Sequence, residues 1–386
     1  MKSKTNLLKI FNIFALGILT ISAIYIITNP NSLSLLTDSK WDTLFSDFEI
    51  HIDFSKNLSQ TYYTSMHACF PPFIYLFYHL IGTLIPQTDS EYAILLLYVV
   101  TTAVLYAIFG FVFSKALRKN DDASVFVALI LLCLSTTSVF GIIERANIVF
   151  LVSILLIVSC MWRNSKSKVK REAALLYIAA AAAIKIYPAV FGLIYICKKR
   201  YKEAVRLIIY GILFFFVPFA FTGGINGILQ FLSNQKNVHE TWGRLSKISI
   251  YSLSKLFGVP NNAALIISAV FALVAIIMFF LAKKNWQKYF ALIFIMVMCP
   301  MWSGQYTICL FFLPFIEFIR EENNNINILN VLSAVMFSLF LSSSIIDRST
   351  TEIKNFLGIL ILFMLILFQI INDKKEVAVF NSGFFL

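Results

Sequence analysis

Charged residues are scarce in this sequence, because Asp, Glu, Lys and Arg together make up only 13% of its 386 residues. Hydrophobic residues make up 59%, and the mean hydropathy is +0.81. A water-soluble domain of this length could not bury so much apolar surface, so most of the chain must be solvated by a bilayer. The sequence also lacks the segments of about ten alternating apolar and polar residues that a transmembrane barrel needs. It therefore predicts an all-α polytopic membrane protein.

Residues typical of metal sites and disulfides are few and scattered. The six cysteines show no paired or metal-ligand spacing and lie mostly in apolar runs, so we interpret them as small core hydrophobes. His51, His67 and His239 are far apart in the sequence, without the spacing of a metal motif. We predict no cofactor and no bound metal, with a divalent cation held by several loop carboxylates as the alternative.

The net charge of +12 is distributed in short loops between apolar runs, with basic clusters at 163–171 and 198–206. This is the positive-inside pattern of a membrane protein and not a nucleic-acid surface, so no nucleic-acid partner is predicted. The rule places the basic loops and both termini in the cytoplasm, and the protein in the plasma membrane, most simply a bacterial inner membrane.

The apolar runs predict about twelve transmembrane helices in a single transmembrane domain, 1–386. The first run follows three lysines and lacks a small-x-small cleavage site, so we interpret it as a retained anchor rather than a signal peptide. The predicted spans are 7–27, 91–117, 123–141, 146–162, 172–184, 187–198, 203–222, 262–282, 288–301, 305–319, 327–346 and 354–372.

Two long outer loops are predicted, 29–90 and 223–261, and the first is rich in acidic residues. It ends in the aromatic segment 70–86, which barely reaches across about 30 Å of hydrocarbon. If this segment crossed the membrane, all later basic loops would lie outside, so we interpret it as re-entrant or interfacial. The spans 172–184 and 187–198 look half-length, about 18 Å each, so the turn between them must face a cavity and not lipid.

The topology places the unusual polar residues on the outer face. Charges near membrane depth cost about 2.5–3.5 kcal/mol, so Arg145 and Lys185 should face a cavity or an anion such as a lipid phosphate. The alternatives are snorkelling to the headgroups and, for Arg145, surface pairing with Glu144. Asp47 is the candidate reactive carboxylate. A helix N-cap or a solvated loop carboxylate is the alternative for it.

Three neighbouring acids, Asp42, Glu49 and Asp53, compete with Asp47 for that role. The segment 234–244 combines amides, an aromatic side chain and cations, which suit sugar hydroxyls and a phosphate. An interfacial helix anchored by Trp242 and Arg244 is the alternative interpretation. Trp302, Gln305 and Tyr306 allow the same two interpretations.

Six motifs occur in order along most of the chain: Ser46-Asp47-Phe48, Phe70-Pro71-Pro72, Arg145-Ala146-Asn147, Ala183-Ile184-Lys185-Ile186-Tyr187-Pro188, the Asn-rich segment from Asn234, and Pro300-Met301-Trp302-Ser303-Gly304-Gln305-Tyr306. In these motifs the chain resembles the GT-C superfamily of integral-membrane glycosyltransferases, and more narrowly glycosyltransferase family 87, the polyprenol-phosphate-mannose-dependent mannosyltransferase type. Two positions depart from the family pattern: Glu144-Arg145 stands where Gly-Gln is commoner, and Gln305 where a His is expected.

The resemblance implies a hexosyltransferase with about a dozen spans and an extracytoplasmic cavity. A polyprenyl-phosphate donor would give its sugar, mannose in the first place, to a hydroxyl of a glycan or glycolipid acceptor. Asp47 would be the general base of an inverting transfer, with the donor phosphate held by Arg145, Lys185 and Arg244. The residues expected to contact substrate are Asn147, Tyr187, Asn234, His239, Trp242, Trp302, Gln305 and Tyr306.

Two other functions fit a polytopic protein with an outer cavity. An O-antigen-type polymerase tends to use arginines of large outer loops, which are sparse here: Arg145, Arg244 and Arg348. A lipid-linked-sugar transporter or flippase predicts ionisable residues along a pathway through both faces, whereas the candidate residues lie on one face.

Overall fold

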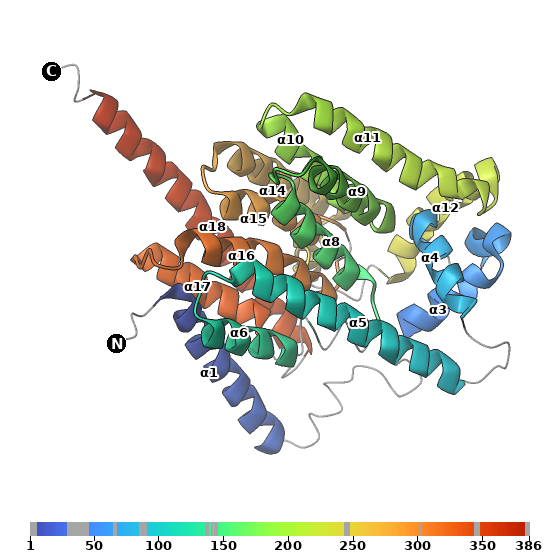
Figure 1. The fold of residues 1–386 in the computed structure, drawn as a ribbon, viewed down its shortest axis with the longest axis horizontal. Helices are drawn as coiled ribbons and strands as arrows, with labels where there is room; N and C mark the ends of the chain where they lie inside the picture. The colour runs from blue at the N-terminus through green and yellow to red at the C-terminus, as the bar shows by residue number, and fades with distance from the viewer. Residues whose placement is uncertain are drawn as a thin grey trace. The chain divides into compact units, whose positions relative to one another are not determined.

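The computed structural model describes residues 6–28, 46–64, 68–84, 91–135, 139, 142, 146–242, 248–301, 303–342 and 348–382. Within these ranges the side chains of residues 26, 46, 91–95, 238–242, 348–350 and 374–382 are not described. The regular elements of the described residues are all helices, which confirms the all-α architecture (Figure 1).

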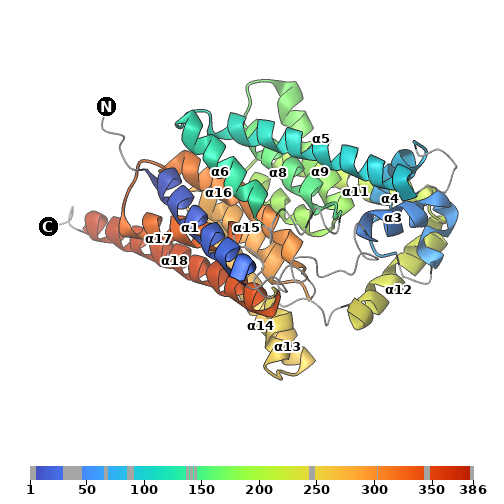
Figure 2. The ribbon, with the colours of Figure 1, turned by 90° about the horizontal axis from the view of Figure 1, so that it is seen from below.

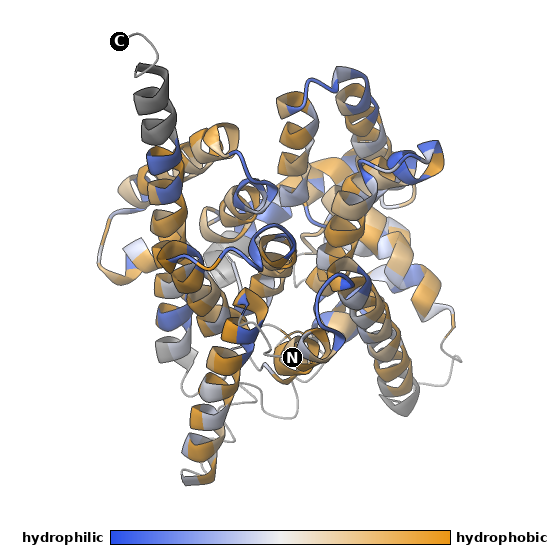
Figure 3. Ribbon diagram, turned by 60° about the vertical axis from the view of Figure 1, so that its left-hand side comes forward, coloured by the Kyte–Doolittle hydropathy of each residue, from blue (hydrophilic) through white to orange (hydrophobic). Residues whose placement is uncertain are grey.

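Five of the described helices are long and apolar enough to cross a membrane: Leu7–Tyr25, Leu96–Leu117, Tyr201–Ala220, Asn261–Leu281 and Thr351–Asp373. Other predicted spans correspond to apolar helices of 10–17 residues, so the number of about twelve crossings stays a prediction. Figure 3 shows hydrophobic residues along most helices and hydrophilic ones mainly at helix ends and turns.

Large apolar side chains lie on the outside of the long helices. Phe111 is 65% exposed and Ile266 is 64% exposed, although both occupy membrane-length helices. In water, such surfaces would be costly, at roughly 25 cal/mol for each Å² of apolar area. Their number and position indicate an integral membrane protein.

The chain divides into two compact units, of which the first contains residues 1–38, 114–140 and 246–386. Its core is aromatic, with Trp286, Phe290, Phe315 and Phe337 fully buried. The helices of this unit are α1 (Leu7–Thr28), α6 (Asp122–Leu134), α13 (Ile250–Leu256), α14 (Asn261–Leu281), α15 (Asn285–Met298), η7 (Gln305–Phe311), α16 (Phe312–Glu322), α17 (Ile328–Leu341) and α18 (Arg348–Ser382).

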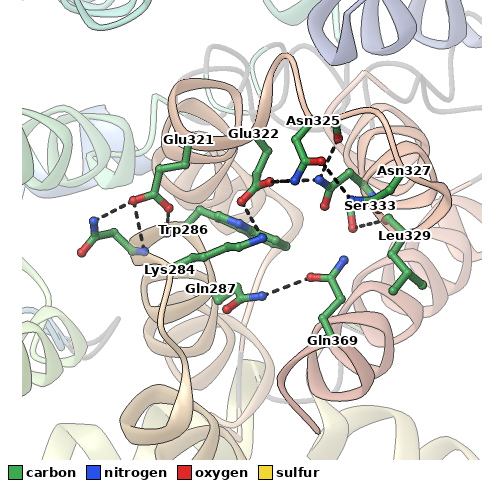
Figure 4. Close-up of polar contacts among 12 residues, drawn as sticks. Lys284, Trp286, Gln287, Glu321, Glu322, Asn325, Asn327, Leu329, Ser333 and Gln369 are labelled. Carbon is green, nitrogen blue, oxygen red and sulfur yellow. Dashed lines mark hydrogen bonds and ion pairs between the residues drawn. The ribbon is translucent and has the colours of Figure 1, made fainter. Parts of the chain in front are cut away.

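A polar network joins the ends of α15, α16 and α17 in this first unit (Figure 4). Glu322, only 4% exposed, forms an ion pair with Lys284 at 2.7 Å. Its second oxygen accepts hydrogen bonds from the side-chain amides of Asn325 and Asn330, at 2.8 and 3.0 Å. The neighbouring carboxylate of Glu321 accepts from the backbone N–H groups at the start of α15. The network therefore satisfies helix ends that would otherwise bury unpaired polar groups.

We expect Glu322→Ala to lower the free energy of unfolding by about 1–3 kcal/mol, because it removes one acceptor of the buried Asn330 amide and the anion that pairs with Lys284. Arg320→Ala is the matched control. The side chain of Arg320 is 43% exposed and pairs with Glu317, and exposed ion pairs contribute little to stability. Thermal unfolding in detergent micelles would compare the two. Equal losses of stability in both variants would contradict the role given to the network.

The second unit contains residues 39–113 and 141–245 and carries most of the candidate site residues. In it, α3 packs against α4, and α9 packs against both α8 and α11 (Figures 1 and 2). Its helices are α3 (Ser46–Lys56), η3 (Leu58–Tyr63), α4 (Pro72–Gly82), most of α5 (Glu91–Leu117), α8 (Val149–Trp162), α9 (Lys168–Ile184), η5 (Tyr187–Gly192), α10 (Leu193–Cys197), α11 (Tyr201–Phe216), η6 (Val217–Ala220) and α12 (Gly224–Trp242).

The half-length prediction for 172–184 was wrong, because α9 has 17 residues and begins at Lys168. Its first turn is basic and so reads as a loop in a hydropathy pattern, but Ser167 caps it by accepting a hydrogen bond from the N–H of Lys170. At 1.5 Å per residue the helix extends about 25 Å. By contrast, α4 has 11 residues and reaches only about 16 Å, roughly half the hydrocarbon thickness. The predicted outer loop 223–261 contains two helices, α12 and α13.

Candidate active site

Asp47 lies in the first turn of α3, where a carboxylate is favoured by the positive end of the helix dipole. Its Oδ2 accepts a hydrogen bond of 2.8 Å from the side-chain amide of Asn147, which is 100 residues away in the sequence. Asp47 is half-buried, and Asn147 is 5% exposed. The contact therefore joins the first turn of α3 to the residues that precede α8, through a carboxylate and an amide that are both at least partly buried.

Asn147 is held in place by the start of α8. Its Oδ1 accepts a hydrogen bond of 3.1 Å from the N–H of Val149, which satisfies a donor in the first turn of the helix. The preceding Ala146 has a φ of +53°, in the left-handed region that non-glycine residues seldom adopt. With its oxygen engaged by α8, the amide of Asn147 can present only its N–H₂ to Asp47. Asn147 thus fixes the direction of the carboxylate.

Lys185 is a buried cation at the C-terminal end of α9. The residue is 9% exposed, and its Nζ lies 4.1 Å from the centroid of the Phe70 ring. An ammonium group over an aromatic face is attracted by the ring's quadrupole, more strongly where water is excluded. A lysine in this position is packed against protein and is unlike one extended to lipid headgroups.

His51 lies within the electrostatic influence of both Asp47 and Lys185. It was not among the residues that we predicted for the site. It lies one turn after Asp47 on α3 and is 8% exposed. Its ring packs on Phe70 at a centroid distance of 4.5 Å and on Tyr78 at 5.3 Å. The pKa of His51 is lowered to about 4, mainly by burial, while the charge of Asp47 opposes this shift and the charge of Lys185 adds to it. The imidazole is therefore neutral at pH 7.

This lowered pKa predicts a pH-dependent stability. Between pH 6.5 and 4 the unfolded state binds a proton that the folded state does not, so stability should fall as the pH drops through that window. The full effect of a shift from 6.5 to about 4 is on the order of 3 kcal/mol. His51→Phe keeps an aromatic ring and cannot be protonated, so its thermal unfolding midpoint should vary less with pH. Identical pH profiles for the two proteins would refute this assignment.

The segment 68–70 is tied down from two sides. The hydroxyl of Tyr62 donates to the carbonyl oxygen of Phe70 at 2.9 Å. The side-chain amide of Asn234 donates to the carbonyl oxygens of Tyr62 and Ala68, both at 2.9 Å, and the amide of Gln235 donates to that of Cys69. Asn234 is fully buried, so the structure places it as a support for this segment.

A small pocket lies beside the Asp47–Asn147 pair. It has a volume of about 40 Å³, and Lys185 does not line it. Its walls are mainly apolar and aromatic, and Thr101, Thr102 and Asn147 add polar groups. The lining residues are Phe48, Phe77, Tyr78, Tyr98, Thr101, Thr102, Leu105, Tyr106, Ile142, Ala146, Asn147, Ile148 and Phe150.

The structure thus brings Asp47, Asn147 and Lys185 into one unit, with Asn234 supporting it. Tyr187 is half-buried at the start of η5 in the same unit, and Gln305 and Tyr306 are half-buried in η7 of the first unit. Arg145, Arg244 and Trp302 lie outside the described residues, as do the side chains of His239 and Trp242 on α12. Among the described residues no three His, Cys, Asp or Glu side chains gather as metal ligands.

A protein-family model matches a large part of this chain. The model of glycosyltransferase family 87 matches residues 69–304, which is more than half of the chain and includes Asn147, Lys185 and Asn234. No curated protein and no solved structure gives a significant match.

Proposed function

Because this chain belongs to glycosyltransferase family 87, a family of GT-C-type membrane glycosyltransferases, we propose that it transfers a hexose from a polyprenyl phosphate to a hydroxyl of a glycan or glycolipid acceptor. Mannose is the sugar proposed in the first place. The reaction takes place on the extracytoplasmic face, where nucleotide sugars are absent and a lipid-carried donor supplies the sugar.

The observation that carries this proposal is the Asp47–Asn147 hydrogen bond. A single-step transfer with inversion needs one carboxylate to remove the proton of the acceptor hydroxyl as the oxygen attacks the anomeric carbon. The amide of Asn147 donates to the carboxylate of Asp47 and fixes its direction. Asp47 is the general base in this scheme, and Asn147 is a positioning residue.

Lys185 suits the second requirement of the transfer, which is stabilisation of the departing phosphate. Negative charge grows on the departing phosphate in the transition state, and a preorganised cation in a water-excluded place stabilises it. Lys185 is 9% exposed as a residue, and its ammonium group lies over the Phe70 ring. Arg145 and Arg244 remain proposed partners of the same phosphate. The proton goes from the acceptor to Asp47, and the electron pair of the broken C–O bond stays on the polyprenyl phosphate.

The apolar pocket supports a lipid-linked substrate. Its walls are mainly apolar and aromatic, and they suit the methylene or isoprene units of a chain. Family membership favours a transferase over the flippase alternative. The O-antigen-type polymerase stays the weaker candidate, because arginines of large outer loops, on which such proteins tend to rely, are sparse in this sequence.

Purified protein in liposomes tests the proposal directly. Polyprenyl phosphates carrying labelled mannose, glucose or galactose would be supplied with a membrane glycolipid extract as acceptor. Transfer of one labelled sugar with release of polyprenyl phosphate is the expected result. Transbilayer movement of the labelled lipid without any new glycosidic bond would show a flippase instead.

A further inference from the structure

Helix α12 turns its apolar side outward. Ile225, Leu229 and Leu232 are 77%, 61% and 59% exposed, and Lys236 is also exposed. Their spacing of four, three and four residues places all of them on one stripe of an α-helix. The stripe, defined as these four residues, is apolar for about two turns and ends in a cation one turn later.

The opposite side of the same helix is buried and carries the amides. Phe231 and Asn234 are 2% and 0% exposed, and Asn234 and Gln235 donate to the carbonyl oxygens of Tyr62, Ala68 and Cys69. A helix of a water-soluble protein has the reverse arrangement, with leucines inward. Leaving a Leu or Ile side chain in water costs about 1.5–3 kcal/mol relative to burial. The outward stripe of α12 therefore needs an apolar environment.

The stripe continues the outer surface of the preceding membrane-length helix. Phe216, Val217 and Phe221 are 50–57% exposed at the end of the span Tyr201–Ala220. The chain then turns at Gly223, whose φ of +93° is readily adopted only by glycine. Gly227 packs so tightly on this turn that a Cβ would lie 2.0 Å from the carbonyl oxygen of Thr222. The two glycines therefore allow a tight turn directly after the span, so that α12 begins at Gly224.

We propose that α12 lies along the membrane surface and that lipid covers its stripe. Ile225, Leu229 and Leu232 would enter the boundary between headgroups and acyl chains, and the ammonium group of Lys236 would lie at the phosphates. The remaining amide-rich face makes α12 unsuited to crossing the bilayer. Asn234 and Gln235 hold the backbone of residues 68 and 69, and the ring of the next residue, Phe70, packs against Lys185. A lipid contact that fixes α12 would therefore also help to fix the position of Phe70. The membrane contact itself does not depend on the proposed reaction.

Spin labels on single cysteines in liposome-reconstituted protein test this contact. The variants are Leu229→Cys and Leu232→Cys, made in a background whose six native cysteines are alanines. Asp53→Cys on α3 is the water reference, and Ile266→Cys on the span Asn261–Leu281 is the lipid reference. Relaxation by oxygen, which concentrates in lipid, is compared with relaxation by a water-soluble nickel chelate.

We expect labels at 229 and 232 to favour oxygen over the nickel chelate, as at 266, and the label at 53 to show the opposite. Preferential access of the nickel chelate to the stripe would show that it faces water and would overturn the proposal. Low access of both agents would show that protein covers it, either a second copy or another partner, and would overturn it equally. The measurement needs no transferase activity, so its outcome is separate from that of the sugar-transfer assay.

Discussion

Asp47→Asn should lower the turnover of sugar transfer by about 10²–10⁴-fold, the range that a general base contributes. The asparagine has the same shape and can still present its oxygen to the amide of Asn147, so the hydrogen bond at 2.8 Å is retained. What it loses is the ability to accept the acceptor's proton. The expected result is therefore a protein of normal abundance and thermal stability with little activity.

The control for this variant lies on the same helix. Asp53→Asn removes an equal charge, but Asp53 is 55% exposed and pairs with Lys56 at 2.8 Å. Surface pairs of this kind contribute little, so the control should keep activity within about twofold of the parent protein. Turnover would be measured with saturating donor and acceptor in liposomes. Undiminished transfer by Asp47→Asn, or an equal loss in the Asp53 control, would reject Asp47 as the base.

The helical architecture could be predicted because apolar length is a property of local sequence. The bounds of α5 and α14 agree with the predicted spans within a residue or two. The prediction failed at α9, where charged residues form the first turns of a helix whose remainder is apolar. Hydropathy measures where a segment is solvated, whereas helix bounds depend on caps and hydrogen bonds, here the cap by Ser167.

The candidate site could be predicted only as a set of residues. Residue type and order in the chain selected Asp47, Asn147 and Lys185, but their pairing depends on contacts between segments 100 or more residues apart. Asn147 was expected to touch a sugar, and the structure shows it orienting Asp47. His51 was missed because a lone histidine has no motif. Its spacing of four residues from Asp47 on one helix was the available signal.

Asn234 shows a different limit. Its neighbours in the sequence are amides and cations, which suggested a sugar-binding loop. In the structure this residue lies on a helix and uses its amide to hold two backbone carbonyls. Sequence patterns identify a hydrogen-bonding side chain, but not whether its partner is a ligand or the protein's own backbone.

Lys185→Met should raise the barrier of sugar transfer by the value of one charge-assisted hydrogen bond to the leaving phosphate, about 1.5–3 kcal/mol. That is a loss of roughly 10- to 100-fold in kcat/KM for the donor. Methionine fills a similar space beside Phe70 without a charge, and the thermal unfolding midpoint of the variant is measured together with its kinetics. If Lys185 mainly supports the fold, Lys185→Met should change the thermal unfolding midpoint. If Lys185 binds the donor phosphate, the variant should lose kcat/KM while the midpoint changes little.

A second measurement separates these roles further. If Lys185 contacts the departing group, product inhibition by polyprenyl phosphate should weaken in Lys185→Met, because the product carries the phosphate that the lysine binds. Lys198→Met removes an exposed lysine from the same unit and should alter neither quantity. Lys185→Arg should recover only part of the activity, since a planar guanidinium does not match an ammonium held over one ring. Unchanged kcat/KM and unchanged product inhibition in Lys185→Met would leave the ammonium group with no part in holding the donor, and the phosphate would then have to be bound by other cations such as Arg145 and Arg244.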